Sequence, residues 1–275
     1  MQLEINVIDA FTDSIFKGNS AAVIITDNWL SAELMQSIAM ENNLAETAFL
    51  VASHSEYLSS EDTAAYYIRW FSPLTEVDFC GHATLASAFV LFSKYPSLTS
   101  ISLSAKAVGV LTIVQTATGK IQMDFPNTKP ERIKDIPESL LAGLSIAPVE
   151  VYRNLQAYFV IYNAESDVLS VVLDNQSLKQ LAPLKLVVTC LADCKIFDKY
   201  DFISRYFVLA TASEDPVTGS IHTGLAPLWA ERLGKNELMA YQASSRGGVL
   251  HCVVVGDRVL ISGNAVQYMT GIISV

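Results

Sequence analysis

The sequence is poor in charged residues, poorer still in basic ones, and has no apolar run long enough to cross a bilayer. Charged residues make up 17% of the 275 positions, and 18 basic residues stand against 28 acidic ones, which gives a formal net charge of −10. A chain without a basic stripe offers no bulk surface to nucleic acid or to an anionic membrane. A spanning helix needs about 20 apolar residues in succession. We therefore expect no nucleic-acid and no membrane partner, although a local site could still hold a small anion.

Cysteine and histidine are scarce, at four residues each. Cys190 and Cys194 have a loose metal-like spacing, but no second pair of cysteines or histidines accompanies them, so we expect no metal site. Residues 1–5 lack the basic and apolar regions with which a signal peptide begins. Free thiols in a reducing compartment, and hence a cytoplasmic location, are the simplest interpretation.

The motifs of the common cofactor sites are missing as well. The sequence contains no Walker loop, no GxGxxG turn and no nucleophile elbow. An enzyme with this sequence is therefore expected to work without a cofactor.

Hydrophobic residues are abundant, at 51%, in a chain long enough for two domains. Ser31 is the expected N-cap of a helix over 32–42. The sequence ATLASAFVLF at 83–92 is hydrophobic almost all round, which is typical of a helix buried on every side. A third helix is expected over 220–233, and strands are predicted at 3–10, 21–26, 47–52, 65–71, 108–115, 120–125, 158–162, 186–189, 204–208, 238–243, 249–255, 258–262 and 264–275.

A polar stretch at 127–132 is interpreted as a linker between two halves. It separates an N-terminal half over 1–126, which the terminal strand 265–275 could join, from a C-terminal half over 127–264. A strand-rich shell around one buried helix per half favours an α+β fold made by duplication over a parallel βαβ sheet.

Two short motifs point to a binding site. The first reads VDFCGHATLA at 77–86, and the second reads EDPVTGSIH at 214–222. In each, an acid precedes a glycine, a polar residue follows it, and a helix comes next, with Gly81 before His82 and Gly219 before Ser220. A helix N-terminus has unpaired N–H groups and a partial positive charge, and glycine lets an anion approach them closely. Matched motifs in two halves suggest a duplicated fold whose halves face a shared pocket.

Glu46 is the leading candidate for chemistry. It lies at the edge of an apolar segment, where desolvation would raise its pKa toward neutrality and suit it to general acid/base catalysis. The alternative is a glutamate at a strand end that faces water. His82 could donate a hydrogen bond to a substrate or assist proton transfer, or it could be a capping or packing residue. The other histidines, His54, His222 and His251, are given no function.

Three further residues have two interpretations each. Asp215 precedes Pro216, so an Asx-Pro turn explains it, but it could also bind a substrate ammonium or hold His82 charged. Ser220 could bind an anion through its hydroxyl and N–H, or only occupy the first turn of the helix. Cys80 could be a thiol base, or a small buried hydrophobic residue.

Several ordered segments resemble the phenazine biosynthesis-like PhzF family, within the diaminopimelate-epimerase-like superfamily, over nearly the whole chain. The segments are DAFT at 9–12, GN at 18–19, NLAETAF at 43–49, RWFSP at 69–73, EVDFCGHAT at 76–84, SRYF at 204–207, EDPVTGS at 214–220 and SGNAV at 262–266. The resemblance implies two similar halves, each a curved, mostly antiparallel sheet or barrel around a central helix, with the active site in the cleft between them. It also implies a homodimer.

The resemblance further implies a role for each matched residue. The residue at Glu46 would move a proton between carbons of a cyclic amino-acid substrate, with His82 and Asp215 as its catalytic partners. Gly81, Gly219, Ser220 and Asn19 would bind the substrate. Related epimerases use two opposed cysteines as bases. Here Cys80 matches one of them and Thr218 occupies the place of the other, so a two-thiol mechanism is not expected.

Departures from the family pattern leave the substrate open. Ser20 stands where proline is usual, Ala45 where many members have serine, and Ala243 where glycine is common after Gln242. The sequence therefore predicts a cofactor-independent isomerase that acts on a small carboxylate-bearing metabolite through Glu46. Two alternatives stay open, namely an amino-acid epimerase or racemase, and a non-catalytic binding or scaffold protein on the same fold.

Overall fold

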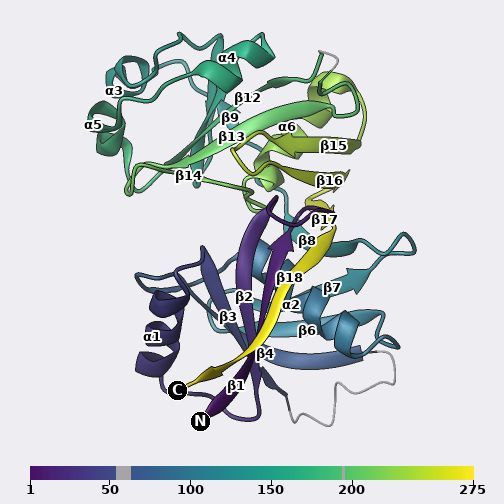
Figure 1. The fold of residues 1–275 in the computed structure, drawn as a ribbon. Coiled ribbons are helices and arrows are strands. Elements are labelled where there is room, and N and C mark those ends of the chain that lie inside the picture. The colour runs from purple at the N-terminus through teal and green to yellow at the C-terminus, as the bar shows by residue number, and fades with distance from the viewer. Residues whose placement is uncertain (54–62, 194–195) are drawn as a thin grey trace. The chain divides into compact units, whose positions relative to one another are not determined.

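The computed structural model describes residues 1–53, 63–193 and 196–275, so His54 and Cys194 lie outside the described residues. Contacts divide the chain into two compact units (Figure 1). Unit 1 comprises Met1–Asp124 and Ser262–Val275, and unit 2 comprises Phe125–Ile261. The C-terminal segment thus belongs with the N-terminal one.

Unit 1 consists of strands around one helix, with a second helix outside. Its helices are α1 (Ala32–Asn42) and α2 (Gly81–Lys94), and its strands are β1 (Gln2–Ala10), β2 (Asn19–Thr26), β3 (Glu46–Ala52), β4 (Thr63–Phe71), β5 (Glu76–Val77), β6 (Ser100–Ala105), β7 (Gly109–Gln115), β8 (Ile121–Pro126) and β18 (Ala265–Ser274). β18 pairs antiparallel with β1 along nearly its whole length.

Unit 2 contains more and shorter elements. Its helices are α3 (Glu138–Ala142), α4 (Glu165–Ser170), α5 (Asn175–Leu178), the 3₁₀ turn η1 (Lys179–Leu181) and α6 (His222–Leu233). Its strands are β9 (Glu131–Arg132), β10 (Glu150–Arg153), β11 (Ala157–Ile161), β12 (Lys185–Leu191), β13 (Phe202–Val208), β14 (Ser213–Asp215), β15 (Glu237–Gln242), β16 (Gly248–Val255) and β17 (Arg258–Gly263).

The two units repeat one strand topology. In unit 1, β1 pairs antiparallel with β2, β2 parallel with β3, β3 antiparallel with β4, and β4 antiparallel with β5 and parallel with β6. In unit 2 the same relations link β10, β11, β12, β13, β14 and β15 in that order. The chain passes through α2 between β5 and β6, and through α6 between β14 and β15. Each unit is therefore a mostly antiparallel sheet with a helix at the corresponding point.

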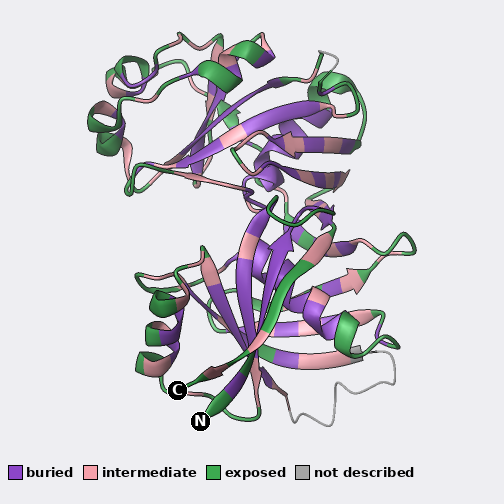
Figure 2. Ribbon diagram, in the orientation of Figure 1, coloured by how far each residue is buried: buried purple, intermediate pink, exposed green. Residues whose placement is uncertain are grey.

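The helices α2 and α6 are the buried centres of their units. In α2, eleven of fourteen residues are buried, and in α6 nine of twelve are, from His222 to Ala230. Figure 2 shows the same burial along the strands of unit 1. A helix that is apolar on every face must be enclosed by other elements, as the sequence at 83–92 predicts. Helix α2 begins two residues earlier than that prediction, so that Gly81 and His82 form its first turn.

Helix α1 covers the outer face of the unit 1 sheet. Ser31 caps it, because its hydroxyl accepts a hydrogen bond from the Leu34 N–H at 3.2 Å, as predicted. Its buried face packs on apolar side chains of the first strands, among them Leu3, Ile24 and Phe49. At the other end, Asn43 takes the left-handed conformation, with φ of 49°, and ends the helix before β3 starts at Glu46.

Several elements of unit 2 were not predicted. The helices α3, α4 and α5 are four to six residues long, which is too short for a periodic apolar pattern to show. They lie over a cluster of buried side chains that includes Leu140, Val168, Leu178 and Val188. Among the described residues, no helix combines the length and hydropathy that a membrane crossing requires.

Gly18, just before β2, is a position where only glycine fits. Its φ is +64°, and a Cβ there would overlap the carbonyl oxygen of Ala10 and press on Thr12. Gly109 has a similar φ of +75° but open space around it. We expect Gly18→Ala to lower the free energy of unfolding by at least about 2 kcal/mol more than Gly109→Ala, which meets only the left-handed backbone cost. Urea unfolding measures both, and equal losses would contradict the overlap.

Candidate active site

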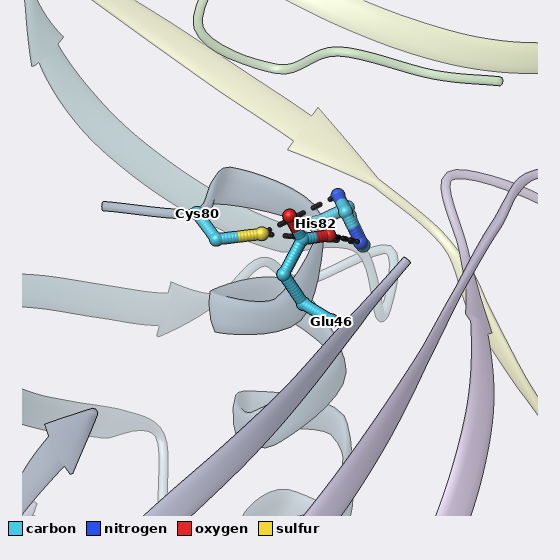
Figure 3. Close-up of side chains that lie close together, drawn as sticks. All are labelled: Glu46, Cys80 and His82. Carbon is cyan, nitrogen blue, oxygen red and sulfur yellow. Dashed lines mark hydrogen bonds and ion pairs between the residues drawn. The ribbon is translucent and has the colours of Figure 1, made fainter. Parts of the chain in front are cut away.

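Glu46 and His82 form an ion pair inside unit 1 (Figure 3). Glu46 is the first residue of β3, and His82 is the second residue of α2. The His82 Nε2 lies 3.0 Å from the Glu46 Oε2, and the two side chains are 7% and 19% exposed. An acid and a base thus meet in a nearly dry setting at the start of the central helix.

Asn19, the first residue of β2, supports the ring from its other side. Its amide nitrogen lies 3.1 Å from the His82 Nδ1, and the Asn19 side chain is buried. With this amide orientation Nδ1 accepts the bond, so Nε2 carries the proton that points at Glu46. A protonated ring requires the amide to turn over and present its oxygen instead. In either state Asn19 contacts His82, whereas the sequence assigns Asn19 to substrate binding, which stays a proposal.

The predicted rise in the pKa of Glu46 is wrong in direction. Burial does raise it, but the charge of His82 and hydrogen bonds from His82 and Cys80 outweigh burial and lower the pKa of Glu46 below its usual range. Burial likewise opposes charge on His82, yet Cys80 and Glu46 raise the pKa of His82 well above 6.5. Because burial raises the pKa of the Cys80 thiol to about 11, that thiol is neutral at pH 7 and the Glu46 carboxylate supplies the charge. The directions of the two shifts favour a carboxylate and an imidazolium, a state in which the Asn19 amide presents its oxygen to Nδ1.

Cys80 completes this group, since its Sγ lies 3.5 Å from the His82 Nδ1 and 3.8 Å from Nε2. Glutamate, cysteine and histidine are all zinc ligands, and their ligand atoms here lie within 4.8 Å of one another. A sulfur that shared a metal with one ring nitrogen would be much farther from the other nitrogen, because the metal lies along the outward lone pair. The sulfur is instead nearly equidistant from both. As arranged, the three side chains do not form a chelate.

In unit 2, the buried side chains of Gln242 and His222 hold the turn that contains Asp215 through hydrogen bonds. The Gln242 amide accepts the Thr218 N–H at 2.9 Å and donates to the Asp215 carbonyl at 2.7 Å. The His222 Nδ1 lies 2.8 Å from the Thr218 carbonyl, and the Thr218 hydroxyl donates to the Asp215 carboxylate. Hydrogen bonds therefore hold both the backbone of this turn and the carboxylate of Asp215.

Ser220, the residue after Gly219, is held in a matching way. Its hydroxyl oxygen accepts a hydrogen bond at 2.9 Å from the amide of Gln156, the residue before β11, and that amide also lies 3.3 Å from the Tyr206 hydroxyl. This contact corresponds to that of Asn19 with His82. In both units, an amide near the start of the second strand holds the side chain that follows the motif glycine.

The two units also repeat an arginine–glutamate ion pair. Arg69 forms a two-pronged ion pair with Glu76, at 2.7 Å for both contacts, and Arg205 does the same with Glu214, at 2.8 Å. Each glutamate stands five residues before its motif glycine. These contacts anchor the short strands β5 and β14, which deliver the chain to the two helix starts.

The N–H groups at the two glycine motifs are available for an anion, namely those that open α2 and those in the turn before α6, whose own first N–H groups bond back to that turn. In the described part of the chain, the backbone N–H groups of Gly81, His82, Gly219 and Ser220 have no acceptor within hydrogen-bonding distance. Such groups at a helix N-terminus bind carboxylates and phosphates. This property is what the two glycine motifs predict for each helix separately.

His222 is the buried counterpart of Thr84, whose hydroxyl donates to the Cys80 carbonyl at 2.7 Å. Burial lowers the pKa of His222 to about 4, although its bond to Thr218 acts in the opposite direction. The unfolded chain therefore binds a proton below about pH 6.5 that the folded chain takes up only near pH 4. We expect acidification across this window to remove about 3 kcal/mol of stability.

The expected loss can be isolated with His222→Gln, which keeps an N–H donor for the Thr218 carbonyl and cannot titrate. Urea unfolding between pH 7 and the acid end of the window should show a flatter dependence for this variant than for the wild type. Parallel curves for the two proteins would contradict the account of His222.

The structure groups the predicted site residues by unit, and two supporting side chains were not predicted. Glu46, His82 and Asn19 meet in unit 1, while Asp215, Gly219 and Ser220 belong to one turn in unit 2. Gln156 and Gln242 were missed as supports, because no local pattern marks a glutamine whose partners are 27 and 64 residues away. The only available signal was positional, since Gln156 precedes β11 as Asn19 begins β2.

Known proteins match this chain in both sequence and structure. The family model for phenazine biosynthesis-like proteins matches residues 8–271. An uncharacterized isomerase of Pseudomonas aeruginosa is 43% identical over 272 residues, covering 98% of each chain. The crystal structure of a PhzF-family phenazine biosynthesis protein from Enterococcus faecalis aligns with a TM-score of 0.89 and 38% identity, covering all of both chains.

A more distant structure defines the wider fold. A hydroxyproline epimerase from Agrobacterium vitis aligns with a TM-score of 0.57 at 11% identity, covering 99% of this chain and 92% of that one. At this identity the likeness concerns the fold alone, and it confirms the predicted epimerase-like α+β fold. With a family model that matches nearly end to end, the chain belongs to the phenazine biosynthesis-like (PhzC–PhzF) family.

Proposed function

We propose that this protein is a cofactor-independent isomerase in which Glu46 moves a proton on a small carboxylate-bearing metabolite. The isomerase class is supported by relatives that carry that name and by the epimerase-like fold. The observation that carries the specific proposal is the buried ion pair of Glu46 and His82. It keeps a carboxylate base and an imidazolium acid 3.0 Å apart, next to the N–H groups of Gly81 and His82, which have no acceptor among the described residues.

The proton moves in two steps. The Glu46 carboxylate takes a proton from a carbon of the substrate, so that a C–H bond breaks and an O–H bond forms while the electron pair enters the substrate's π system. The same O–H bond then breaks as the proton returns to a second carbon and the double bond shifts. His82, as imidazolium, stabilises the negative charge that develops between the steps.

The turn of unit 2 is proposed to bind charged groups of a small metabolite. Asp215 would hold a cationic group, and the N–H groups of Gly219 and Ser220 would hold an anionic one. A helix terminus contributes only about 0.3–1 kcal/mol toward an exposed anion, and up to about 2 when partly buried. Enzymatic rate enhancement needs roughly 8 kcal/mol or more, so positioning and acid/base chemistry must supply most of it.

The second candidate is an epimerase that uses a single base. It is favoured by the fold of the hydroxyproline epimerase. Only a single-base mechanism is considered, because Thr218 stands where Cys80 has its counterpart and a hydroxyl is a far weaker base than a thiolate at neutral pH. The isomerase is the better supported assignment, because the relatives at 40–43% identity carry that name.

Deuterium incorporation from D₂O tests the proposal. The protein is incubated with a panel of small cyclic and amino carboxylates, and products are followed by NMR. An isomerase gives a rearranged product, which carries deuterium at the new C–H position only if the proton on Glu46 exchanges with solvent before it returns, and an epimerase labels only a stereocentre. Neither rearrangement nor exchange with any compound that binds would overturn the catalytic assignment in favour of a binding protein. A cytoplasmic location and a homodimer remain part of the proposal, and light scattering tests the homodimer.

A further inference from the structure

Unit 1 contains a cavity of about 860 Å³ at the edge of β4, a volume within the roughly 300–1,000 Å³ of small-molecule sites. Its lining consists of residues 67–70 of β4, 76–78 at and after β5, 104–107 at the end of β6, and Trp29. Neither Glu46 nor His82 is among these residues. The proposed proton transfer therefore leaves the cavity without a role.

The strand pairings show which part of unit 2 corresponds to this cavity. β4 pairs with β5 and β6 as β13 pairs with β14 and β15. The registers and the two glycine motifs give four pairs of equivalent positions, namely Ile68 with Ser204, Val77 with Asp215, Cys80 with Thr218, and Ala105 with Gln242.

In unit 2, a carboxamide occupies the corresponding place. The Gln242 amide oxygen accepts the Thr218 N–H at 2.9 Å, and the amide nitrogen donates to the Asp215 carbonyl at 2.7 Å. Beside it, the Ala243 N–H donates to the Ser204 carbonyl at 2.7 Å. One buried amide group thus serves a backbone donor and a backbone acceptor between β14 and β15.

In unit 1, the equivalent backbone groups lack these partners. Ala105 carries no amide, and the parallel pairing of β4 with β6 stops one position before it. The Lys106 N–H and the Ile68 carbonyl form no bond with each other, and the Cys80 N–H has no acceptor among the described residues. No described side chain donates to the Val77 carbonyl, which has a second lone pair to offer. One donor and two acceptors therefore remain at the cavity.

The charged residues of the lining favour a neutral ligand. Two are basic, Arg69 and Lys106, and two are acidic, Glu76 and Asp78. Arg69 and Glu76 are already paired at 2.7 Å. The lining thus has no net charge with which to attract an ion of either sign.

We propose that this cavity binds a small molecule with a primary carboxamide group, placed as the Gln242 side chain is placed in unit 2. The two N–H groups of the amide would donate to the Val77 and Ile68 carbonyls, and its oxygen would accept the Cys80 N–H. Trp29 and Tyr67, which are 39% and 46% exposed, offer aromatic surface to the body of the ligand. The inference does not depend on the proposed function.

Benzamide is the probe for the first measurement. The protein is labelled with ¹⁵N at its cysteines, and the Cys80 amide signal is assigned by its loss in Cys80→Ser. We expect benzamide to move the Cys80 amide proton downfield in a saturable way, with a Kd on the order of 1 mM for a ligand of this size. The signals of Cys190 and Cys252 should stay in place. Benzoate has the same shape but no N–H donor, and should bind at least about tenfold more weakly.

Substitution of Ala105 tests the location. Ala105→Gln supplies from the chain the amide that Gln242 supplies in unit 2, and should abolish the effect of benzamide on Cys80. Ala105→Glu is the matched control, since its side chain has the same length but cannot donate to the Val77 carbonyl. We expect Ala105→Gln to unfold at a higher urea concentration than Ala105→Glu. Glu46→Gln should bind benzamide as the wild type does, because Glu46 does not line the cavity.

Three results would overturn the inference. A Cys80 shift that persists in Ala105→Gln would show that benzamide binds elsewhere. Benzoate that binds as tightly as benzamide would show that the site does not select an amide. The absence of a saturable Cys80 shift in the wild type would exclude the site, and this measurement requires no variant to fold.

Discussion

Replacing Glu46 by glutamine is expected to reduce proton exchange by about 10²–10⁴-fold, the range that general acid/base catalysis supplies. The amide has the shape of the carboxylate and can still accept a bond from the His82 Nε2–H, but it cannot take a proton at neutral pH. The loss should therefore appear in turnover and not in substrate affinity. Deuterium exchange and direct binding, measured on the same compound, separate the two.

Glu41→Gln is the control for this substitution, because Glu41 lies exposed on α1 and its replacement alters the net charge by the same amount. It should exchange protons at the wild-type rate. Glu46→Gln at a wild-type rate, with the fold intact by circular dichroism, would remove Glu46 from the mechanism.

Replacing His82 by glutamine is expected to reduce exchange about 10²-fold and to remove the basic limb of the pH profile. In the proposed mechanism, exchange needs Glu46 ionised and His82 protonated. The pKa of Glu46 is below 4.5 and that of His82 is well above 6.5, so activity should form a plateau between the two. Without an imidazolium to lose its proton, the variant should decline only on the acid side.

The same pair sets part of the pH dependence of stability. A lowered pKa of Glu46 gives stability that is present above about pH 4.5 and is lost as the pH falls through the folded-state value. A raised pKa of His82 gives stability that is present below about pH 6.5 and is lost as the pH rises through its folded-state value.

A basic limb of the exchange profile that survives in His82→Gln would contradict the assignment of His82 as the acid.

Local patterns predicted the parts of the fold that they determine. Ser31, followed by apolar residues at helical spacing, is enough to place α1 to the residue. The apolar sequence at 83–92 predicts a central helix, although its start came two residues early because Gly81 and His82 carry no apolar signal. Runs of β-branched and other apolar residues between turn residues allow most of the strands to be predicted within two residues of their bounds.

Tertiary contacts decide the rest, and no sequence window contains them. Desolvation of Glu46 is visible in its apolar neighbours, which is why a raised pKa was predicted. The opposing charge comes from His82, 36 residues away, and reverses the direction. Likewise the contact of Gln156 with Ser220 depends on how β11 and α6 pack. The repeated motif predicted a duplication, but only the strand pairings show that Gln156 takes the position of Ser20, the residue after Asn19.

A crystal structure with a bound carboxylate, chosen from the compounds that exchange deuterium, tests the central claim most directly. We predict that the exchanging carbon lies within about 3.5 Å of a Glu46 carboxylate oxygen. A Glu46 carboxylate turned away from the exchanging carbon would contradict the account.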